Sequence, residues 1–346
     1  MSTKVYVGMS GGVDSSLTAS LLVEQGYDVT GIYMKNWTQD LPGMKCPWAD
    51  DLADAKRVAV QLGIDFKVFD FENEYRHKVV DYMIEEYKRG RTPNPDIMCN
   101  QEVKFKLFLE AAIAVGADMI ATGHYAQVDN GVLKQAVDTN KDQTYFLYRV
   151  TGEALQKTLF PLGGFTKPTV RDMALERGLY TAGKKDSQGI CFVGKIGIRE
   201  FLSQYVEQTP GAIIDKQSGK TLGHHDGAIF YTLGQRHGLD VGGGLPYYVV
   251  GKDMDKNEVY VTTNLNDETL WRSSVSIQDV HWINRQPQPG KYQIRIRHRA
   301  PLIDTTLAYS DSGVDLTLHD HQRAITAGQS VVIYDGDICL GGGIVA

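Results

Sequence analysis

The stretch GMSGGVDSS, residues 8–16, decides the fold, because it joins the apolar run at 4–9 to a segment with helical spacing. In that segment Val13, Leu17 and Leu21 fall on one face. The order predicts a strand, a glycine-rich loop and a helix. Glycines let a backbone approach an anion closely, and the free N–H groups of a helix start can bind it. The stretch lacks the lysine of a Walker A loop and the G-x-G-x-x-G spacing of a dinucleotide fingerprint. It therefore predicts a phosphate-binding loop of another kind, with a plain glycine-rich turn as the alternative.

Up to about residue 125 the chain repeats this order of strand and helix. Apolar runs at 28–34, 65–71 and 118–125 alternate with segments of helical spacing at 52–62 and 103–116. Such an alternation predicts a parallel sheet with helices on both faces. Ligands of these sheets bind at the carboxyl ends of the strands. Three of those ends carry polar or glycine-rich loops, where we expect the site: 8–16, 34–38 and 122–125.

After roughly residue 200 the helical spacing fades, and short strands joined by Gly, Asp and Asn turns follow. We expect an α/β domain over residues 1–200, a β-rich central domain over 201–268 and a second β-rich domain over 269–346. A chain of 346 residues is long enough for this division, since single cores stop growing near about 250–300 residues.

Composition narrows the classes of protein that remain. Hydrophobic residues make up 42% of the chain, and no apolar run is long enough to span a membrane. The N-terminus enters a strand at once, so we expect neither a secretory signal nor a transit peptide. Four cysteines without a C-x-x-C pair predict neither a disulfide scaffold nor a zinc knuckle. We therefore expect a reducing compartment. Its net charge of −6 is a weak argument against nucleic acid.

The loop S-G-G-x-D-S after a first strand resembles the pyrophosphate loop of the N-type ATP pyrophosphatases. This resemblance implies cleavage of ATP between its α- and β-phosphates and adenylation of a substrate oxygen. Two cysteines suggest that sulfur then displaces the activated oxygen. We expect Asn100 to cap a helix and to place Cys99 just before its N-terminus, where the dipole favours a thiolate. Cys191 follows two lysines, whereas Cys46 and Cys339 are expected to be small buried hydrophobes.

Eight motifs, in order along nearly the whole chain, resemble those of the bacterial tRNA-specific 2-thiouridylases. They are GMSGGVDSS (8–16), GIYMKNW (31–37), TPNPDIMCN (92–100), ATGHYA (121–126), KDQTYFLY (141–148), KDSQGICFVG (185–194), GHHDGAIFYTLGQRHGL (223–239) and CLGGGIV (339–345). The resemblance implies 2-thiolation of the wobble uridine of tRNA(Lys), tRNA(Glu) and tRNA(Gln). It also implies ATP, Mg²⁺, a cytoplasmic location and a persulfide sulfur that comes from a cysteine desulfurase or a sulfur-relay protein. For the fold it implies an N-type ATP pyrophosphatase domain, a central β-rich domain and a C-terminal β-barrel that contacts tRNA. Gln127 is a departure, because relatives often carry a basic residue there.

The resemblance assigns binding roles to the matching residues. Met34 and Gly123 would lie near the adenosine, and Mg²⁺ would come with ATP rather than on protein ligands. The ATP phosphates would be held by Gly8, Met9, Ser10, Gly11, Gly12, Val13, Asp14 and Ser15. Contacts with tRNA would fall on His124, Lys141, Asp142, Gln143, Arg297, His298 and Gln329.

The resemblance also assigns the chemistry. Asn94, Pro95 and Asp96 would surround the flipped uracil, and Asp96 is a candidate acid or base. Cys191 would carry the persulfide. Cys99 would be the nucleophile that resolves this persulfide and ends in a transient disulfide with Cys191. Because the two cysteines are far apart in the sequence, their meeting requires a loop to close over the site, which would also keep water from the adenylate.

Periodicity adds one prediction about tRNA binding. If QIRIRHRA (293–300) is a strand, Arg295, Arg297 and Arg299 share one face at intervals of roughly 6.6 Å, which suits a phosphate backbone. The alternative is a solvated strand face. A second basic stretch, YKRGR (87–91), directly precedes the proposed base pocket. The neighbouring histidines 224 and 225 lack a third partner at metal-site spacing, so we expect them to be structural or to face RNA.

Two other functions stay open from the sequence alone. One is another adenylating ATP pyrophosphatase, an amidotransferase or ligase that acts on a small molecule. It would need an ammonia source, and it leaves the β-rich domains and both cysteine loops unexplained. The other is a non-catalytic RNA-binding protein that kept a degenerate nucleotide loop, against which the intact S-G-G-V-D-S stretch argues.

Overall fold

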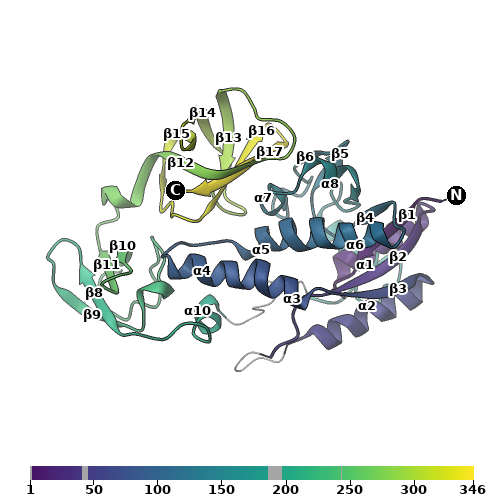
Figure 1. Cartoon of the computed structure of the whole chain (residues 1–346), viewed down its shortest axis with the longest axis horizontal. Helices are drawn as coiled ribbons and strands as arrows, with labels where there is room; N and C mark the ends of the chain where they lie inside the picture. The colour runs from purple at the N-terminus through teal and green to yellow at the C-terminus, as the bar shows by residue number, and fades with distance from the viewer. Residues whose placement is uncertain (1, 41–45, 186–196, 243) are drawn as a thin grey trace.

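The computed structural model describes residues 2–40, 46–185, 197–242 and 244–346 (Figure 1). Cys191 lies outside the described residues. The N-terminal part contains a five-stranded sheet in the order β3-β2-β1-β4-β7, and every neighbouring pair in it is parallel. The chain runs from β1 outward to β3 and then returns to place β4 on the other side of β1. Loops that follow β1 and β4 therefore flank the crevice where such sheets bind ligands. The strands are β1 Lys4–Gly8, β2 Asp28–Lys35, β3 Asp65–Asp70, β4 Met119–Ala121 and β7 Thr158–Leu159.

Helices cover both faces of this sheet, as its apolar strands require. On one face Val5 and Val7 of β1 pack with residues of α1 (Val13–Glu24) and α2 (Trp48–Leu62). On the other face Tyr6 and Ile120 pack with a cluster that includes Phe108. The prediction of a parallel sheet with helices on both faces is thus confirmed.

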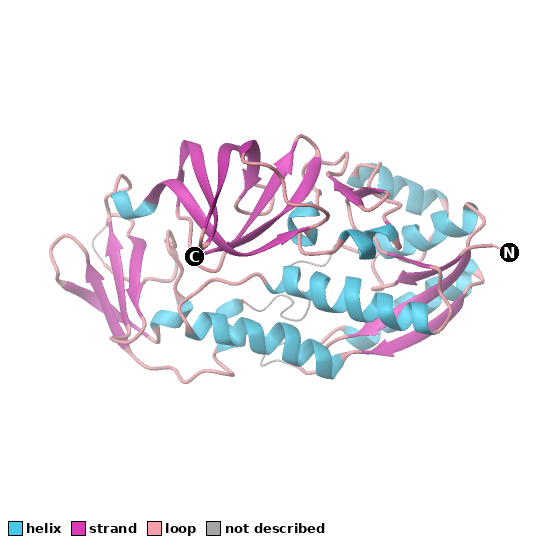
Figure 2. Cartoon of the chain, turned by 45° about the horizontal axis from the view of Figure 1, so that its top comes forward, coloured by secondary structure: helices cyan, strands magenta, loops and turns pink. Residues whose placement is uncertain are grey.

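Two long helical rods lie side by side, share the cluster that covers the sheet's second face, and extend away from the sheet (Figure 1, Figure 2). Each rod is an α-helix interrupted by a π-helical segment. The first rod consists of α3 Glu72–Tyr75, η1 Arg76–Asp81 and α4 Tyr82–Lys88. The second consists of α5 Pro95–Met98, η2 Cys99–Leu107 and α6 Phe108–Ala114. The shorter helices of this part are α7 Thr144–Leu147, α8 Gly152–Gln156, α9 Lys167–Glu176 and α10 Ile198–Leu202.

Two expected elements differ from the structure. The strand expected over 118–125 spans only Met119–Ala121, because the residues after it turn to line the site. The helix expected over 103–116 belongs to the longer second rod, which begins at Pro95.

A small four-stranded sheet follows, in the order β10-β11-β8-β9. Its strands are β8 Gly211–Asp215, β9 Thr221–His225, β10 Tyr248–Asp253 and β11 Glu258–Thr262. Two short 3₁₀ turns, η3 Ala228–Phe230 and η4 Glu268–Leu270, lie within and after it. Around Ile213, Val249 and Val259 it has a small core of its own.

The C-terminal part is a closed six-stranded barrel, as expected. Its strands run in the order β12-β15-β14-β13-β16-β17, and antiparallel pairing of β12 with β17 closes the ring. A hairpin of β5 and β6 from the N-terminal part adds to β17 through the pairing of Ile338 with Lys134, which the sequence did not indicate. The strands are β12 Trp271–Trp282, β13 Gly290–Arg295, β14 Ile303–Ser310, β15 Gly313–Arg323, β16 Ser330–Asp335, β17 Ile338–Val345, β5 Gln127–Asp129 and β6 Val132–Lys134.

Candidate active site

The loop between β1 and α1 is folded on itself. The backbone N–H of Ser10 donates to Oγ of Ser15 at 3.1 Å, and this hydroxyl donates to the carbonyl of Gly12 at 3.1 Å. Gly12 occupies the N-cap position of α1, so that helix starts at the loop. The loop thus presents a helix N-terminus and serine hydroxyls to the crevice, an arrangement that favours an anion.

Glycine is required at two positions around this loop. Gly11 has a φ of +74°, and a Cβ there would lie 2.3 Å from the backbone oxygen of Asp51. Gly123, after β4, packs so closely on the loop that a Cβ would lie 2.9 Å from the backbone nitrogen of Ser15. Any side chain at either position would push the phosphate loop out of place.

A cavity of about 470 Å³ opens beside the loop. All three strand-end loops where the sequence predicts the site line this cavity. The predicted ATP residues on its wall are Gly8, Met9, Ser10, Gly12, Val13, Asp14, Ser15, Met34 and Gly123. Residues to which the sequence assigned no individual role also line it, among them Asn36, Trp37, Trp48, Asp51, Tyr75, Lys104 and Tyr125. Arg299, which the sequence predicted to face phosphate, lines it as well.

Four of the predicted tRNA contacts line the same cavity: His124, Lys141, Gln143 and His298. His298 comes from the barrel, and its ring lies 4.5 Å from that of Phe146. Burial lowers the pKa of His298 to about 4, with the neighbouring Arg299 guanidinium as a second cause. Burial, and next the charge of Lys104, also holds the pKa of His124 well below its usual range. Both rings are therefore neutral at pH 7 and can meet RNA by stacking or hydrogen bonds.

The remaining predicted tRNA contacts lie elsewhere. The Asp142 carboxylate is buried and accepts from the guanidinium of Arg295 at 2.7 Å, which joins the N-terminal part to the barrel. Arg297 is exposed and donates to the carbonyl of Ala324. The side chain of Gln329 accepts from the backbone N–H of Thr326 at 3.1 Å.

The expectation that Arg295, Arg297 and Arg299 share one face of a strand is wrong. Strand β13 ends at Arg295, so the alternation that would place the three side chains on one face stops there. Arg295 is buried against Asp142, and Arg299 turns the chain with a φ of +63° and donates to the carbonyl of Asn140. The polypeptide leaves the barrel at this point to reach the cavity, which a strand could not do.

The residues of the proposed base pocket, Asn94, Pro95 and Asp96, lie at the start of the second rod. Asn94 is the N-cap of α5: its Oδ1 accepts from the backbone N–H groups of Asp96 and Ile97 at 3.1 and 3.4 Å. Pro95 occupies the first turn, where a missing N–H costs nothing. The expectation that Asn100 caps a helix is therefore wrong. Cys99 does not precede a helix but lies one turn inside it.

Residues 3–195 match the profile of the tRNA methyl transferase HUP domain, 199–263 that of a tRNA methyl transferase PRC-barrel domain, and 272–345 that of an aminomethyltransferase beta-barrel domain. A relative named tRNA-specific 2-thiouridylase MnmA, from Listeria welshimeri, is 49% identical over 99% of this chain and 94% of its own length. This chain belongs to the MnmA family of tRNA-specific 2-thiouridylases. A second relative, tRNA-specific 2-thiouridylase MnmA 2 from Geobacillus kaustophilus, is 48% identical over 99% of this chain and 94% of its own. Among solved structures, a 4-thiouridine synthetase–RNA complex with bound ATP is similar at a TM-score of 0.39 and 18% identity, covering 59% of this chain and 50% of that one.

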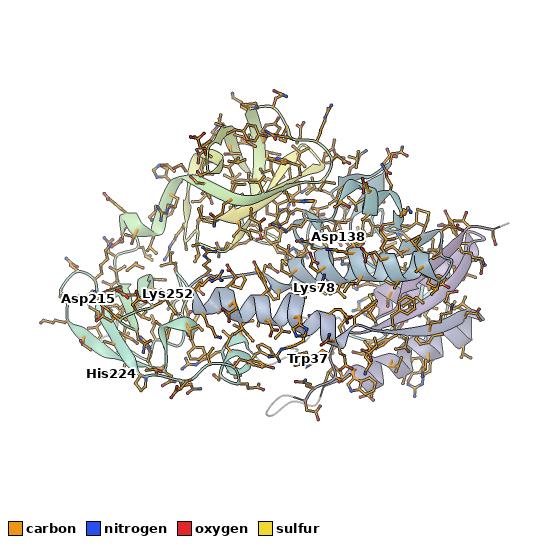
Figure 3. All side chains as sticks on the ribbon, in the orientation of Figure 1. Trp37, Lys78, Asp138, Asp215, His224 and Lys252 are labelled. Atoms are coloured by element: carbon orange, nitrogen blue, oxygen red, sulfur yellow. The ribbon has the colours of Figure 1, made fainter. Side chains whose placement is uncertain are left out.

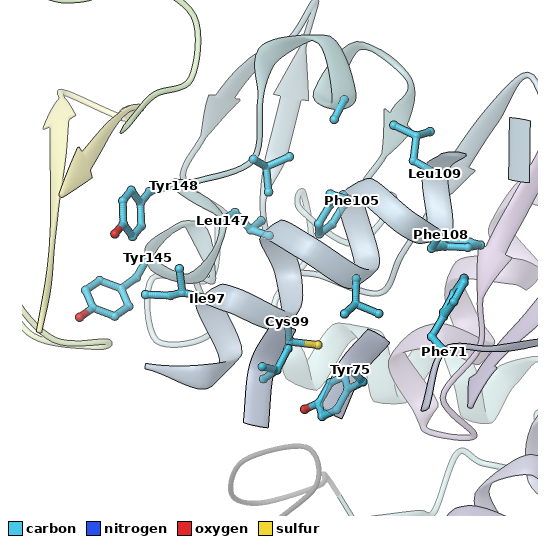
Figure 4. Packing of buried hydrophobic residues seen from close by; sticks show 14 of the residues in the cluster. Phe71, Tyr75, Ile97, Cys99, Phe105, Phe108, Leu109, Tyr145, Leu147 and Tyr148 are labelled. Atoms are coloured by element: carbon cyan, nitrogen blue, oxygen red, sulfur yellow. The ribbon is translucent and has the colours of Figure 1, made fainter. Parts of the chain in front are cut away.

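The three described cysteines of this 2-thiouridylase family member lie in different surroundings. Cys99 is 1% exposed and packs in the cluster that contains Tyr75, Ile97 and Phe105 (Figure 4). Burial raises the pKa of the Cys46 thiol, and it raises that of Cys339 far more. Cys339 packs in the core, as expected of a small hydrophobe, but Cys46 also lines the cavity.

Histidine and carboxylate side chains, which are common metal ligands, occur throughout the described residues. In that part of the chain no group of three or more His, Cys, Asp or Glu side chains could hold a metal ion. The neighbouring histidines of β9 differ in exposure: His225 is buried and accepts from the N–H of Gly227, whereas His224 is exposed (Figure 3).

Among the described residues, none of the helices has both the length and the apolar character needed to cross a membrane.

Proposed function

We propose that this protein converts a uridine of tRNA into 2-thiouridine, with ATP as the activating substrate. The proposed target is the wobble uridine of tRNA(Lys), tRNA(Glu) and tRNA(Gln), and the proposed compartment is the cytoplasm. Membership in the 2-thiouridylase family supports the reaction class. The observation that carries the proposal is that one cavity is lined both by the phosphate loop and by His124, Lys141, Gln143 and His298.

The reaction needs two substrates at that cavity. Uracil O2 is an amide-like oxygen and a poor leaving group. Attack of O2 on the α-phosphorus of ATP forms an O–P bond and releases pyrophosphate, after which the oxygen can leave as part of AMP. Residues 8–15 would hold the phosphates, with Met34 and Gly123 beside the adenosine. The uracil must leave the anticodon stack, which costs a few kcal/mol that other RNA contacts must offset.

Sulfur would arrive as a persulfide on Cys191. Its terminal sulfur attacks C2 of the uracil, the C–O bond to AMP breaks, and Cys99 attacks the Cys191 sulfur to cleave the S–S bond. The products are 2-thiouridine, AMP and a Cys99–Cys191 disulfide that a reductant must reopen. A cysteine desulfurase or a sulfur-relay protein would reload Cys191. Asp96, at the start of α5, is the candidate acid or base.

Magnesium would bind together with ATP. This ion prefers oxygen ligands and usually shares them between one or two carboxylates and substrate phosphates. The Asp14 carboxylate lines the cavity beside Ser10 and Ser15, so the donor set fits this use. Bound there, Mg²⁺ would neutralise phosphate charge and support departure of pyrophosphate.

The test is mass analysis of nucleosides from tRNA(Lys) that has been incubated with the protein, Mg-ATP and a persulfide donor. We expect 2-thiouridine together with AMP and pyrophosphate. Cys99→Ser should abolish the thionucleoside, whereas Cys339→Ala and Cys46→Ala should retain it. A wild-type protein that forms no 2-thiouridine would contradict the proposal, and an indispensable Cys46 or Cys339 would overturn the cysteine relay.

ATP–pyrophosphate exchange, measured with and without tRNA and together with tRNA binding, separates the two alternatives. A small-molecule ligase would exchange pyrophosphate with ATP without any need for tRNA. A non-catalytic RNA-binding protein would bind tRNA and show no exchange at all.

A further inference from the structure

The phosphate loop lacks a lysine in its own sequence, but the fold brings one to it from 153 positions away. Nζ of Lys167, at the start of α9, lies 2.7 and 2.8 Å from the two carboxylate oxygens of Asp14. The hydroxyl of Tyr125 donates to the same carboxylate at 2.8 Å. Lys167 is 7% exposed, whereas the Asp14 side chain keeps 32% of its surface open and lines the cavity.

Both donors to Asp14 are themselves held in place by the loop 138–143. The backbone N–H of Lys167 donates to Oδ2 of Asp138 at 2.8 Å, and Oδ1 of Asp138 accepts from the N–H of Lys141 at 3.1 Å. Tyr125 exchanges two bonds of 2.9 Å with Gln143, one through its N–H and one through its carbonyl. Burial of an ammonium group costs free energy unless the charge is paired, so the ion pair with Asp14 is what allows Lys167 to be buried beside the phosphate loop.

We propose that Lys167 is the positioning residue of the phosphate loop: it fixes the Asp14 carboxylate and neutralises its charge, so that Mg-ATP can bind beside it. An unpaired carboxylate on this wall would repel the triphosphate. Oδ1 of Asp14 accepts from both Lys167 and Tyr125, whereas Oδ2 accepts from Lys167 and keeps a second lone pair that it can still offer to magnesium. The inference rests on the proposed use of ATP at this loop, and it extends that function to a residue outside the loop motif.

The fold supplies a matched control. Helices α1 and α9 pack through Val13, Leu17 and Val170, and an ion pair joins them at each end. At the far end, Arg177 contacts the carboxylate oxygens of Glu24 at 2.6 and 2.9 Å. Removal of either pair weakens the docking of the two helices, but only Lys167 touches the phosphate loop.

The experiment measures Mg-ATP affinity by calorimetry, with and without tRNA(Lys), together with tRNA affinity and thermal unfolding. Lys167→Met should weaken Mg-ATP binding about tenfold or more and raise the Mg²⁺ concentration needed for half-saturation. Its tRNA affinity should stay within about twofold of the wild-type value. Arg177→Met should lower the unfolding temperature without weakening Mg-ATP.

A double variant tests whether Lys167 acts through Asp14. In an Asp14→Asn background, Lys167→Met should cause no further loss of Mg-ATP affinity, because the group that it positions is already changed. Additive losses, unchanged binding in Lys167→Met, or equal losses in Lys167→Met and Arg177→Met would each overturn the inference. A wild-type protein that binds no Mg-ATP would instead refute the proposed function, and the two failures are therefore distinguishable.

Discussion

At the scale of single residues, the histidines of the site show how burial sets what a side chain can offer. The family resemblance predicts that His298 contacts tRNA, and the sequence places it between Arg297 and Arg299. In the structure the ring packs on Phe146 and its pKa is lowered to about 4 by burial and then by Arg299. If His298 contacts tRNA as proposed, it offers an aromatic face and a neutral nitrogen.

This shift makes stability depend on pH. The unfolded chain, in which His298 has its ordinary pKa near 6.5, takes up a proton between about pH 6.5 and 4, whereas the folded protein does not. Folding stability that comes from neutral His298 is present above pH 6.5 and is lost as the pH falls toward 4. We expect His298→Phe, which keeps the ring, to gain stability relative to the wild type across this window. Thermal unfolding from pH 4 to 8 measures the difference, and a difference that is constant with pH would contradict the expectation.

At the scale of elements, the start of the second rod shows what sequence patterns can and cannot locate. The helical spacing over 103–116 predicts a helix there, and the structure contains it. The true start lies at Pro95, because Asn94 with Pro at the next position is the stronger helix-start signal, and Asn100 lies inside the helix. The sequence thus predicted the cap at Asn100 and the base pocket at Asn94, whereas Asn94 itself is the cap.

The cap can be separated from the proposed contact with the base. Only Oδ1 of Asn94 accepts the two N–H groups, so Asp at this position keeps the cap but removes the amide donor. We expect Asn94→Ala to lower stability by about 1 kcal/mol and to impair thiolation more than tRNA binding. Asn94→Asp should retain the stability and still lose thiolation. Thiolation assays and thermal unfolding of both variants test this, and full activity in Asn94→Asp would leave Asn94 with the cap alone.

At the scale of the whole molecule, local sequence patterns predicted the sheets and helices but not the contacts between residues that are far apart in the sequence. The parallel sheet, the strand-end site and the β-rich C-terminal part follow from spacing within short windows. The hairpin β5–β6 that extends the barrel, the Lys167–Asp14 pair and the Asp142–Arg295 pair each join residues that are distant in the sequence. No local signal marks which partner a lone lysine or aspartate will meet. For the same reason the alternation in QIRIRHRA predicted a continuous strand, whereas the chain turns after Arg295 to complete the cavity wall.

Substitution of buried Arg295, which pairs with Asp142, and of exposed Arg297 should have opposite effects on protein stability and on the salt dependence of tRNA binding. Arg295 is 7% exposed and bonded to Asp142, so Arg295→Met leaves a carboxylate in the interior without its cation and should destabilise the protein by roughly 3–5 kcal/mol. It should not change the salt dependence of tRNA binding, because a buried guanidinium releases no counterion. Arg297 is exposed, and Arg297→Ala should reduce the slope of log affinity against log salt by about 0.7 to 0.9 while weakening all substrate tRNAs alike. The measurements are salt titrations of tRNA affinity and thermal unfolding, with Arg295→Lys as the variant that keeps the charge. If Arg297→Ala left the slope unchanged, the tRNA backbone would have to be held by another surface.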